Sequence, residues 1–229
     1  MSSPLESAPQ FGPSDVIGPQ DSRTKPANLA VTPYLAICLL HPMAARGGRA
    51  IRIGTGWLVA RSLVVTAGHV LEGAHTIKGW FAYDDSAGRA VSEFEETGFE
   101  IHPEYVQHGS SAFDVGVIRL ASALPELSVL DVGQISIGDN RLHVAGYPLD
   151  RPWDGLNMAE AQGELKEDLG DILFHDVDAE DGQSGAPIWQ QDPLRVVAMH
   201  TTGKGGTHPQ LNGGVVMNDS VLDWIKSKQ

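Results

Sequence analysis

The feature that most constrains the fold is a succession of short apolar runs between about residues 35 and 218, rich in Val, Ile, Leu and aromatic residues. Gly, Pro, Asn or Asp separates the runs, and the chain holds 26 Gly and 14 Pro in 229 residues. Runs of this kind, divided by turn residues, are typical of β-strands. They read LAICLL, AIRIGTGWLVA, SLVVTAGHV, GWFAY, DVGVIRL, LHVAGY, DILFHDV, APIW, RVVAMHT and GGVVMN. The sequence therefore predicts an all-β protein.

The runs fall into two groups on either side of residues 121–133, a stretch with little strand character. We therefore predict two β-rich halves joined in this stretch. Only the end of the chain, SVLDWIKSKQ, has apolar residues at helical spacing, so we predict a terminal helix there, capped by Asn218 or Asp219. Residues 1 to about 30 are rich in Pro, Ser and Gly without a hydrophobic period, which predicts a flexible arm.

The charge of the chain limits its partners. A formal net charge of -13, from 16 Lys+Arg against 29 Asp+Glu, repels phosphate backbones and anionic lipid surfaces, so we expect neither nucleic acid nor a membrane as a partner. Eight of the acidic residues lie between positions 164 and 181, where we expect a solvated face. No apolar run approaches the ~18 residues of a membrane span. A monomer is expected.

The chain has a single cysteine, Cys38, inside the apolar run YLAICLL. One cysteine forms neither an internal disulfide nor a zinc cluster by itself, so we predict a buried core thiol. We also expect no metal and no cofactor. The opening residues lack the basic start and apolar run of a secretory signal. The sequence thus leaves two locations open: the cytosol, or secretion after a signal has been removed, which we favour.

The stretch DGQSGAPIW places Ser184 close to Gly182 and Gly185. Such a serine is either part of an ordinary tight turn or part of a backbone that must come close to a reacting carbonyl. An activated serine needs a base, and the base needs a group that orients it. TAGHV places His69 after an apolar run, at a strand end, and FDVGVIRL places Asp114 at the head of a strand. The sequence thus offers all three groups.

TAGHV, DVGVIRL and GQSGAP resemble the three catalytic blocks of the chymotrypsin-like serine proteases, in this order, and HPEY at 102–105 resembles the segment before the catalytic aspartate. Four further segments resemble the bacterial glutamyl endopeptidases of the staphylococcal V8 type: VIGPQDSRTK at 16–25, GYP at 146–148, VVAMHTTG at 196–203 and GGVVMN at 213–218. The resemblance covers most of the chain. It implies two six-stranded antiparallel Greek-key β-barrels, residues 16–128 with His69 and Asp114, and residues 129–229 with Ser184 and the terminal helix.

The resemblance also implies a mechanism. Ser184 is the nucleophile of a serine endopeptidase that forms an acyl-enzyme with a peptide substrate, His69 is its general base and then acid, and Asp114 orients His69. The backbone N–H groups of Gly182 and Ser184 form an oxyanion hole. The alternative is an idle protease fold used as a binding module, but such proteins usually lose a residue of the triad, and this chain keeps all three.

Two sequence signals for the substrate pocket conflict. His200 matches the pocket histidine of the glutamyl endopeptidases, and a partly protonated imidazole favours Glu or Asp. Asp178, however, matches the aspartate with which trypsin-like enzymes bind Arg or Lys, and Ala179 replaces a threonine usual in the V8-type branch. Pairing of Asp178 with His200, raising the pKa of the imidazole, would reconcile these signals. The pocket wall is expected at Thr201, Thr202 and Gly203. An acidic preference is favoured, and basic and small side chains remain alternatives.

Two further residues concern activation. In the digestive relatives an aspartate at the position of Gln183 forms an ion pair with the new amino terminus, and a glutamine cannot do so. A neutral amide here agrees with the V8-type branch. In that branch the freed terminal amine helps to receive an acidic side chain, which implies processing before Val16. Residues 1–15 are then a flexible pro-segment or its remnant, or else a tail without a role.

Overall fold

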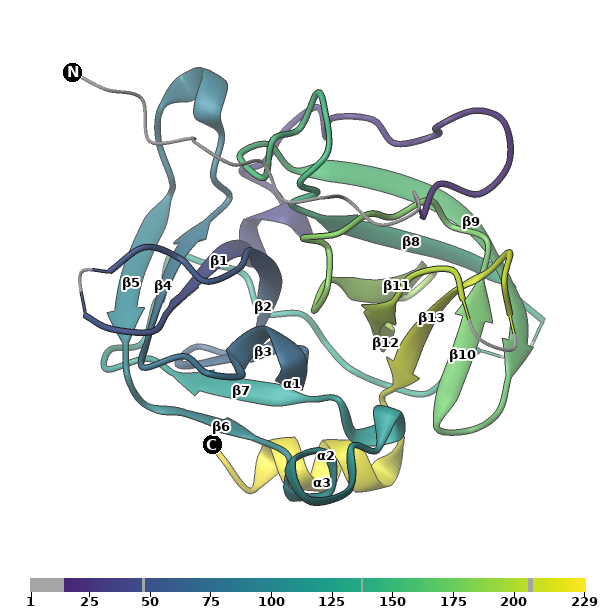
Figure 1. The fold of residues 1–229 in the computed structure, drawn as a ribbon. Coiled ribbons are helices and arrows are strands. Elements are labelled where there is room, and N and C mark those ends of the chain that lie inside the picture. Colours follow the sequence, from purple (N-terminus) through teal and green to yellow (C-terminus); the bar gives the residue numbers. More distant parts are fainter. Residues whose placement is uncertain (1–14, 47, 137, 206–207) are drawn as a thin grey trace.

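The computed structural model describes residues 15–46, 48–136, 138–205 and 208–229, which form two antiparallel sheets lying next to each other (Figure 1). The first sheet has seven strands in the order β5 (Ser92–Glu96), β4 (Thr76–Phe81), β1 (Ile37–Met43), β2 (Gly54–Ala60), β3 (Leu63–Thr66), β7 (Gly116–Arg119) and β6 (Phe99–Ile101). The second is a closed barrel of β10 (Ile172–His175), β13 (Asn212–Val216), β12 (Leu194–Thr202), β11 (Pro187–Gln191), β8 (Arg141–Gly146) and β9 (Ala159–Asp168). The predicted all-β class and the two β-rich halves are confirmed.

The first sheet differs from the expected closed barrel of six strands. It is an open half-barrel whose edge strands, β5 and β6, do not pair with each other. The sequence of β5, SEFEE, alternates half-buried and exposed residues and carries three glutamates. Charged side chains on an edge strand oppose pairing with a further strand, which fits an edge that stays open.

The helices are short. They are η1 (Tyr34–Ala36), α1 (Gly68–Leu71), η2 (Asp85–Ala87), α2 (Pro103–His108), η3 (Ser111–Phe113) and α3 (Asp219–Lys226). The terminal helix is confirmed, and Asn218 caps it by accepting the N–H of Val221 at 3.1 Å. The HPEY segment supplies the N-cap, His102, and the first residues of α2, a helix that the sequence did not predict. None of the helices among the described residues is long and apolar enough to cross a membrane.

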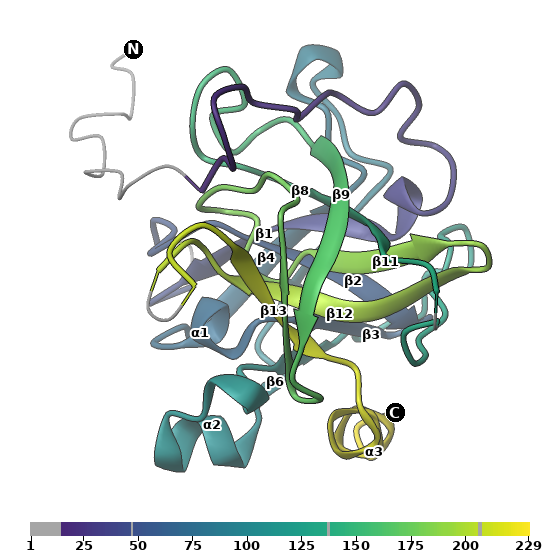
Figure 2. The same cartoon turned by 90° about the vertical axis from the view of Figure 1, so that its right-hand side faces the viewer.

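Helix α3 packs on the first half of the molecule, although it follows the second half in the chain. The ring of Trp224 lies 4.8 Å from that of His102, and Lys228 Nζ binds Glu100 at 2.7 Å. Turning the molecule by 90° leaves α2 and α3 at the same end (Figure 2). The end of the chain therefore ties the two halves together.

The core runs beneath both sheets. Strand β1 is buried along nearly its whole length between β4 and β2, and its Cys38 is fully buried, as predicted; burial raises the pKa of this thiol. Large side chains such as Trp57 and Trp189 are almost completely shielded from solvent. This packing gives the loops at the junction of the two sheets a rigid support.

Candidate active site

His69 lies in α1, directly after the buried strand β3, so its predicted place at a strand end is confirmed. Gly68 allows the turn to approach the neighbouring segments: a Cβ there would lie 2.9 Å from Ile101 Cγ2 and 3.1 Å from Asp114 Oδ1. The guanidinium of Arg52 donates to the backbone carbonyl of His69. These contacts hold the backbone of His69 independently of its ring.

Asp114 follows η3 and precedes β7, and it is 5% exposed. Its Oδ2 lies 2.7 Å from His69 Nδ1, and its Oδ1 accepts the backbone N–H of His69 at 2.8 Å. Since a carboxylate accepts hydrogen bonds, the ring places its hydrogen on Nδ1, which leaves Nε2 as an acceptor in the neutral imidazole. The imidazole is thus oriented and ready to accept a proton.

Ser184 lies in the loop before β11 and is partly exposed. The N–H of Thr55, in β2 of the other sheet, donates to its carbonyl at 2.9 Å. The next residue, Gly185, donates to the carbonyl of His200 at 2.8 Å, and a Cβ on it would lie 2.9 Å from the nitrogen of Ala67. This close approach presses the serine loop against the turn that carries His69.

The N–H groups of Gly182 and Ser184 have no hydrogen-bond partner within the described part of the chain. The carbonyls of the same two peptide units are bound: Asp181 accepts from Leu149 N at 2.7 Å, and Gln183 accepts from Ala186 N at 2.9 Å. Because a trans peptide points its N–H away from its C=O, these bonds fix the direction of both free donors. Gly182 has φ +93°, which glycine adopts without strain.

The predicted pocket histidine, His200, lies in β12 and is 2% exposed. Its pKa is lowered to about 3, mainly by burial and also by the nearby His175 and His69. The predicted partly protonated imidazole is therefore wrong, because an almost completely buried cation without a counter-charge is disfavoured. Its Nδ1 has no partner among the described residues, and the ring of His175 lies 5.9 Å away.

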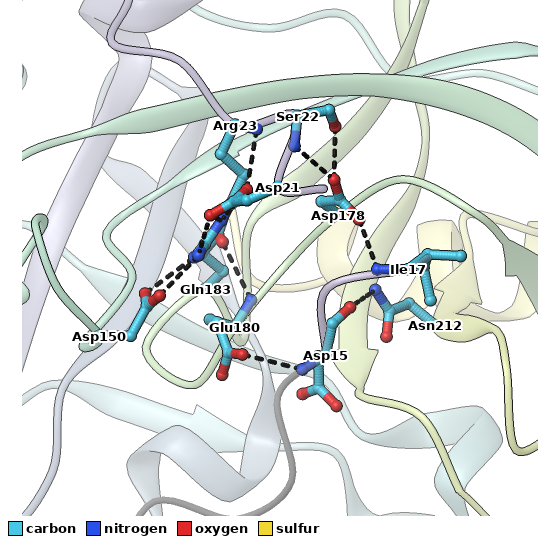
Figure 3. Close-up of polar contacts among 10 residues, drawn as sticks. All are labelled: Asp15, Ile17, Asp21, Ser22, Arg23, Asp150, Asp178, Glu180, Gln183 and Asn212. Carbon is cyan, nitrogen blue, oxygen red and sulfur yellow. Dashed lines mark hydrogen bonds and ion pairs between the residues drawn. The ribbon is translucent and has the colours of Figure 1, made fainter. Parts of the chain in front are cut away.

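Asp178 is buried, but it does not pair with His200. Its Oδ1 accepts the N–H of Ile17 at 2.5 Å, and its Oδ2 accepts the N–H and the hydroxyl of Ser22 at 2.7 and 2.6 Å (Figure 3). The predicted pairing, and the raised imidazole pKa that went with it, are corrected by these contacts. Both carboxylate oxygens are used to hold the start of the described chain.

The remaining residues of the predicted pocket come from two separate segments of the chain and differ in exposure. Ala179 is fully buried in the second half, Thr201 is nearly buried, and Thr202 at the end of β12 is exposed. Gln183 is completely buried, and its side-chain oxygen accepts the N–H of Glu180 at 3.1 Å. Glu180 and Asp178 are thus buried members of the acidic segment for which a solvated face was expected.

The predicted flexible arm is wrong for its described part. Asp15 donates its N–H to Glu180 Oε1 at 2.8 Å, and its Oδ1 accepts the N–H of Lys204 at 2.9 Å. The Asp15 carboxylate lies against Gly203, where a Cβ would be 1.9 Å from Oδ2. The pKa of Asp15 is raised to about 6, mainly by burial; the Lys204 N–H opposes the rise, and the charge of Glu180 adds to it. Residues 1–14 of the predicted pro-segment lie outside the described residues.

A second anchor of the arm is Arg23, whose side chain is completely buried. Its guanidinium binds Asp21 at 2.7 Å and Asp150 at 2.6 Å (Figure 3). The composition of the arm did not predict these contacts of Arg23, because the arm is polar and rich in turn residues. The one available signal was an arginine two positions after an aspartate, Asp21.

A half-barrel and a closed barrel meet where the His69–Asp114 pair and the Ser184 loop lie. This arrangement defines a chymotrypsin-like serine protease. A model of the trypsin-like peptidase domain matches residues 54–199. The chain therefore belongs to the trypsin-like peptidase family, whose members are serine-type hydrolases.

Curated relatives and solved structures agree with this family. The chain is 26% identical over 242 residues to the glutamyl endopeptidase of Bacillus licheniformis, covering 93% of this chain and 70% of the relative. It is 21% identical over 228 residues to the glutamyl endopeptidase of Staphylococcus aureus strain MRSA252, and spans 58% of that relative's length. A solved Glu endopeptidase in complex with MPD has a TM-score of 0.81 at 23% identity, covering 93% of this chain and 98% of its own. The protease Anisep from Arthrobacter nicotinovorans has a TM-score of 0.70 at 16% identity, covering 86% and 96%.

Proposed function

We propose that the protein is a serine endopeptidase in which Ser184 attacks the scissile carbonyl of a peptide substrate. His69 Nε2 takes the proton of the hydroxyl and later gives it to the leaving amine, and a water molecule releases the acyl-enzyme in the same way. The observation that carries this proposal is that Asp114 hydrogen-bonds both the ring and the backbone N–H of His69. That contact holds the tautomer in which Nε2 accepts.

The oxyanion of the tetrahedral intermediate is stabilised by the N–H groups of Gly182 and Ser184. Support comes from their lack of any partner in the described residues while the carbonyls of the same peptide units are bound. Donors fixed in advance need no reorganisation when charge develops, and the loss of one donor typically costs about 10²–10³ in rate. Such donors bind the oxyanion of the transition state better than the carbonyl of the planar substrate. This difference in binding is what raises the rate of the reaction.

Acidic side chains are the preferred class before the scissile bond. Asp178 is directed to Ile17 and Ser22, so both of its oxygens are unavailable to a substrate cation. His200 offers a neutral imidazole, and a neutral imidazole donates from one of its ring nitrogens to a carboxylate; its buried Nδ1 has no partner among the described residues. The curated relatives named above are glutamyl endopeptidases, which supports the same preference. Recognition through Thr201, Thr202 and Gly203 would have the extended substrate pair with the backbone at the C-terminal end of β12, beyond its pairing with β11.

Processing before Val16 belongs to this proposal. In the uncut chain the Asp15 carboxylate lies against Gly203, at the expected pocket wall, and accepts the Lys204 N–H. A substrate carboxylate directed to the same place meets this occupant and its charge. Removal of residues 1–15 empties that place and leaves a terminal amine on Val16.

A panel of peptides that differ only in Glu, Gln, Leu or Arg before the scissile bond tests this function. Glu should exceed Gln, Leu and Arg in kcat/KM, and a chain beginning at Val16 should widen the Glu preference. His200→Ala should reduce cleavage after Glu more than cleavage after Leu, the internal control. Equal losses on both substrates would contradict a pocket that reads acids.

Asp178→Asn separates the acidic preference from the basic alternative. Because Asp178 serves the arm, this substitution should leave the ratio of Arg to Glu cleavage unchanged while it lowers stability, by about 1–3 kcal/mol for a disrupted buried hydrogen-bonding carboxylate. Urea unfolding and the peptide panel measure the two effects. A selective loss of Arg cleavage would instead place Asp178 in the pocket and support the basic alternative.

A further inference from the structure

Thr55 connects the first half of the molecule to the serine loop of the second. It lies in β2, is fully buried, and is 127 positions from Gly182 in the sequence. Its hydroxyl donates to the carbonyl of Gly182 at 2.9 Å, and its backbone N–H donates to the carbonyl of Ser184 at 2.9 Å. One residue thus holds both residues whose N–H groups are the proposed oxyanion donors.

The remaining polar atoms of Thr55 are also bound. The N–H of Tyr147 donates to its hydroxyl at 3.0 Å, and the hydroxyl of Thr66 donates to its carbonyl at 2.7 Å. A Cβ on Gly146 would lie 2.7 Å from the Thr55 hydroxyl, and one on Gly185 would lie 2.2 Å from the Thr55 carbonyl. The site is therefore too tightly enclosed for the threonine to turn or shift.

The hydroxyl has a particular consequence at Gly182. Glycine has the least restricted backbone of all residues, so its own covalent geometry does not hold φ at +93°. The two peptide units that flank Gly182 are held from outside, one by Leu149 N on the Asp181 carbonyl and the other by the Thr55 hydroxyl on the Gly182 carbonyl. Without the hydroxyl, one of these two anchors is lost.

We propose that Thr55 is a positioning residue: by binding the carbonyls of Gly182 and Ser184 it holds the peptide units that follow the two oxyanion-stabilising N–H groups, and so keeps these N–H groups in the direction set by the bonds on the Asp181 and Gln183 carbonyls. This inference rests on the proposed function, because it assigns those two donors to the transition state. Thr55 itself does not touch the substrate. It acts in the transition state through the direction of the two N–H groups and has no part in ground-state binding.

The variant Thr55→Val keeps the size and branching of the side chain but removes the hydroxyl, leaving the Gly182 carbonyl and the Tyr147 N–H unpaired. Its kcat should fall about 10- to 100-fold with little change in KM, because the donors are misdirected but not removed. Thr55→Ser restores the donor and should retain activity within about threefold. Thr76→Val, a buried threonine in β4 whose hydroxyl has no partner in the described residues, is the matched control and should keep its kcat.

A readout specific for positioning is inhibition by a peptide aldehyde, which forms a tetrahedral adduct with the serine. Thr55→Val should weaken the aldehyde by the same factor as kcat/KM, while a cleaved product peptide, which has no such oxyanion, should bind with unchanged affinity. Equal weakening of both ligands, or full activity in Thr55→Val, would overturn the inference. If Thr55→Val is not folded by circular dichroism, Thr55→Ala, which cannot overpack the site, is measured in the same way.

Failure of this inference is distinguishable from failure of the proposed function. If the wild type hydrolyses peptides and Thr55→Val does so equally well, only the role of Thr55 is wrong. If the wild type neither hydrolyses peptides nor binds the aldehyde covalently, the proposed function itself is wrong.

Discussion

The carboxylate of Asp114 holds His69 at two points, with Oδ2 2.7 Å from the ring Nδ1 and Oδ1 accepting the backbone N–H at 2.8 Å. The two residues are 45 positions apart; Asp114 lies just before β7 and His69 just after β3. β3 and β7 are hydrogen-bonded neighbours, with Thr66 paired to Gly116, so the sheet itself brings the ends together. The orientation of the base is thus a property of the rigid half-barrel.

Asp114→Asn tests this orientation. The amide presents one acceptor where the carboxylate presents two, so the ring is driven toward the wrong tautomer; kcat/KM should fall by about 10⁴-fold while KM changes little. Steady-state hydrolysis of a Glu peptide measures the loss, with circular dichroism confirming the fold. A loss smaller than tenfold would show that Asp114 does not orient the base.

Gly182→Ala tests the geometry of the serine loop. A Cβ at this position would lie 2.4 Å from the carbonyl oxygen of Tyr147, and φ is +93°. The loop must shift, so we expect kcat to fall by about 10²-fold or more, together with a loss of stability. Gly88→Ala is the matched control, because Gly88 also has positive φ but nothing lies within 4 Å of its Cβ position. It should lose only about 1 kcal/mol of stability and keep its kcat.

Asp15 gives the arm a pH dependence. Its pKa of about 6 lies above the ordinary 3.8, so the folded chain binds the proton more tightly than the unfolded chain does. The docked arm is therefore favoured below pH 3.8 and loses stability as the pH rises from there through 6. After allowance for solvent screening of this half-buried group, the change is about 1 kcal/mol.

Asp15→Asn removes that titration. Between pH 4 and pH 7 the free energy of unfolding of the wild type should fall by about 1 kcal/mol relative to that of the variant. Urea unfolding at several pH values measures the difference. A constant difference over this range would show that Asp15 is not buried as a carboxylic acid against Gly203.

The sequence predicted the class of fold and the parts of the site that depend on local pattern. His69 follows a strand, Asp114 precedes one, and the terminal helix begins at its Asn218 cap, because each of these depends on neighbouring residues. The partner of Asp178 could not be predicted in this way. Ile17 and Ser22 lie 161 and 156 positions away, in a segment whose composition suggested a mobile arm.

The protonation of His200 was missed for a related reason. A histidine in a pocket motif suggests a cation, but its charge depends on burial and on the groups around it. Here the ring is almost completely buried, His175 lies nearby, and the expected counter-charge, Asp178, faces the arm. Thr55 was missed because its partners are the backbone carbonyls of Gly182 and Ser184, which leave no trace in the sequence.

The most direct measurement of the central claim is covalent labelling by a fluorophosphonate, which reacts with a serine only when a base and an oxyanion site activate it. The wild type, or the chain beginning at Val16, should take up one label on Ser184; Ser184→Ala should take up none, and the exposed-serine control Ser122→Ala should label as the wild type does. Absence of label from both forms of the wild type, or equal label on Ser184→Ala, would contradict the account.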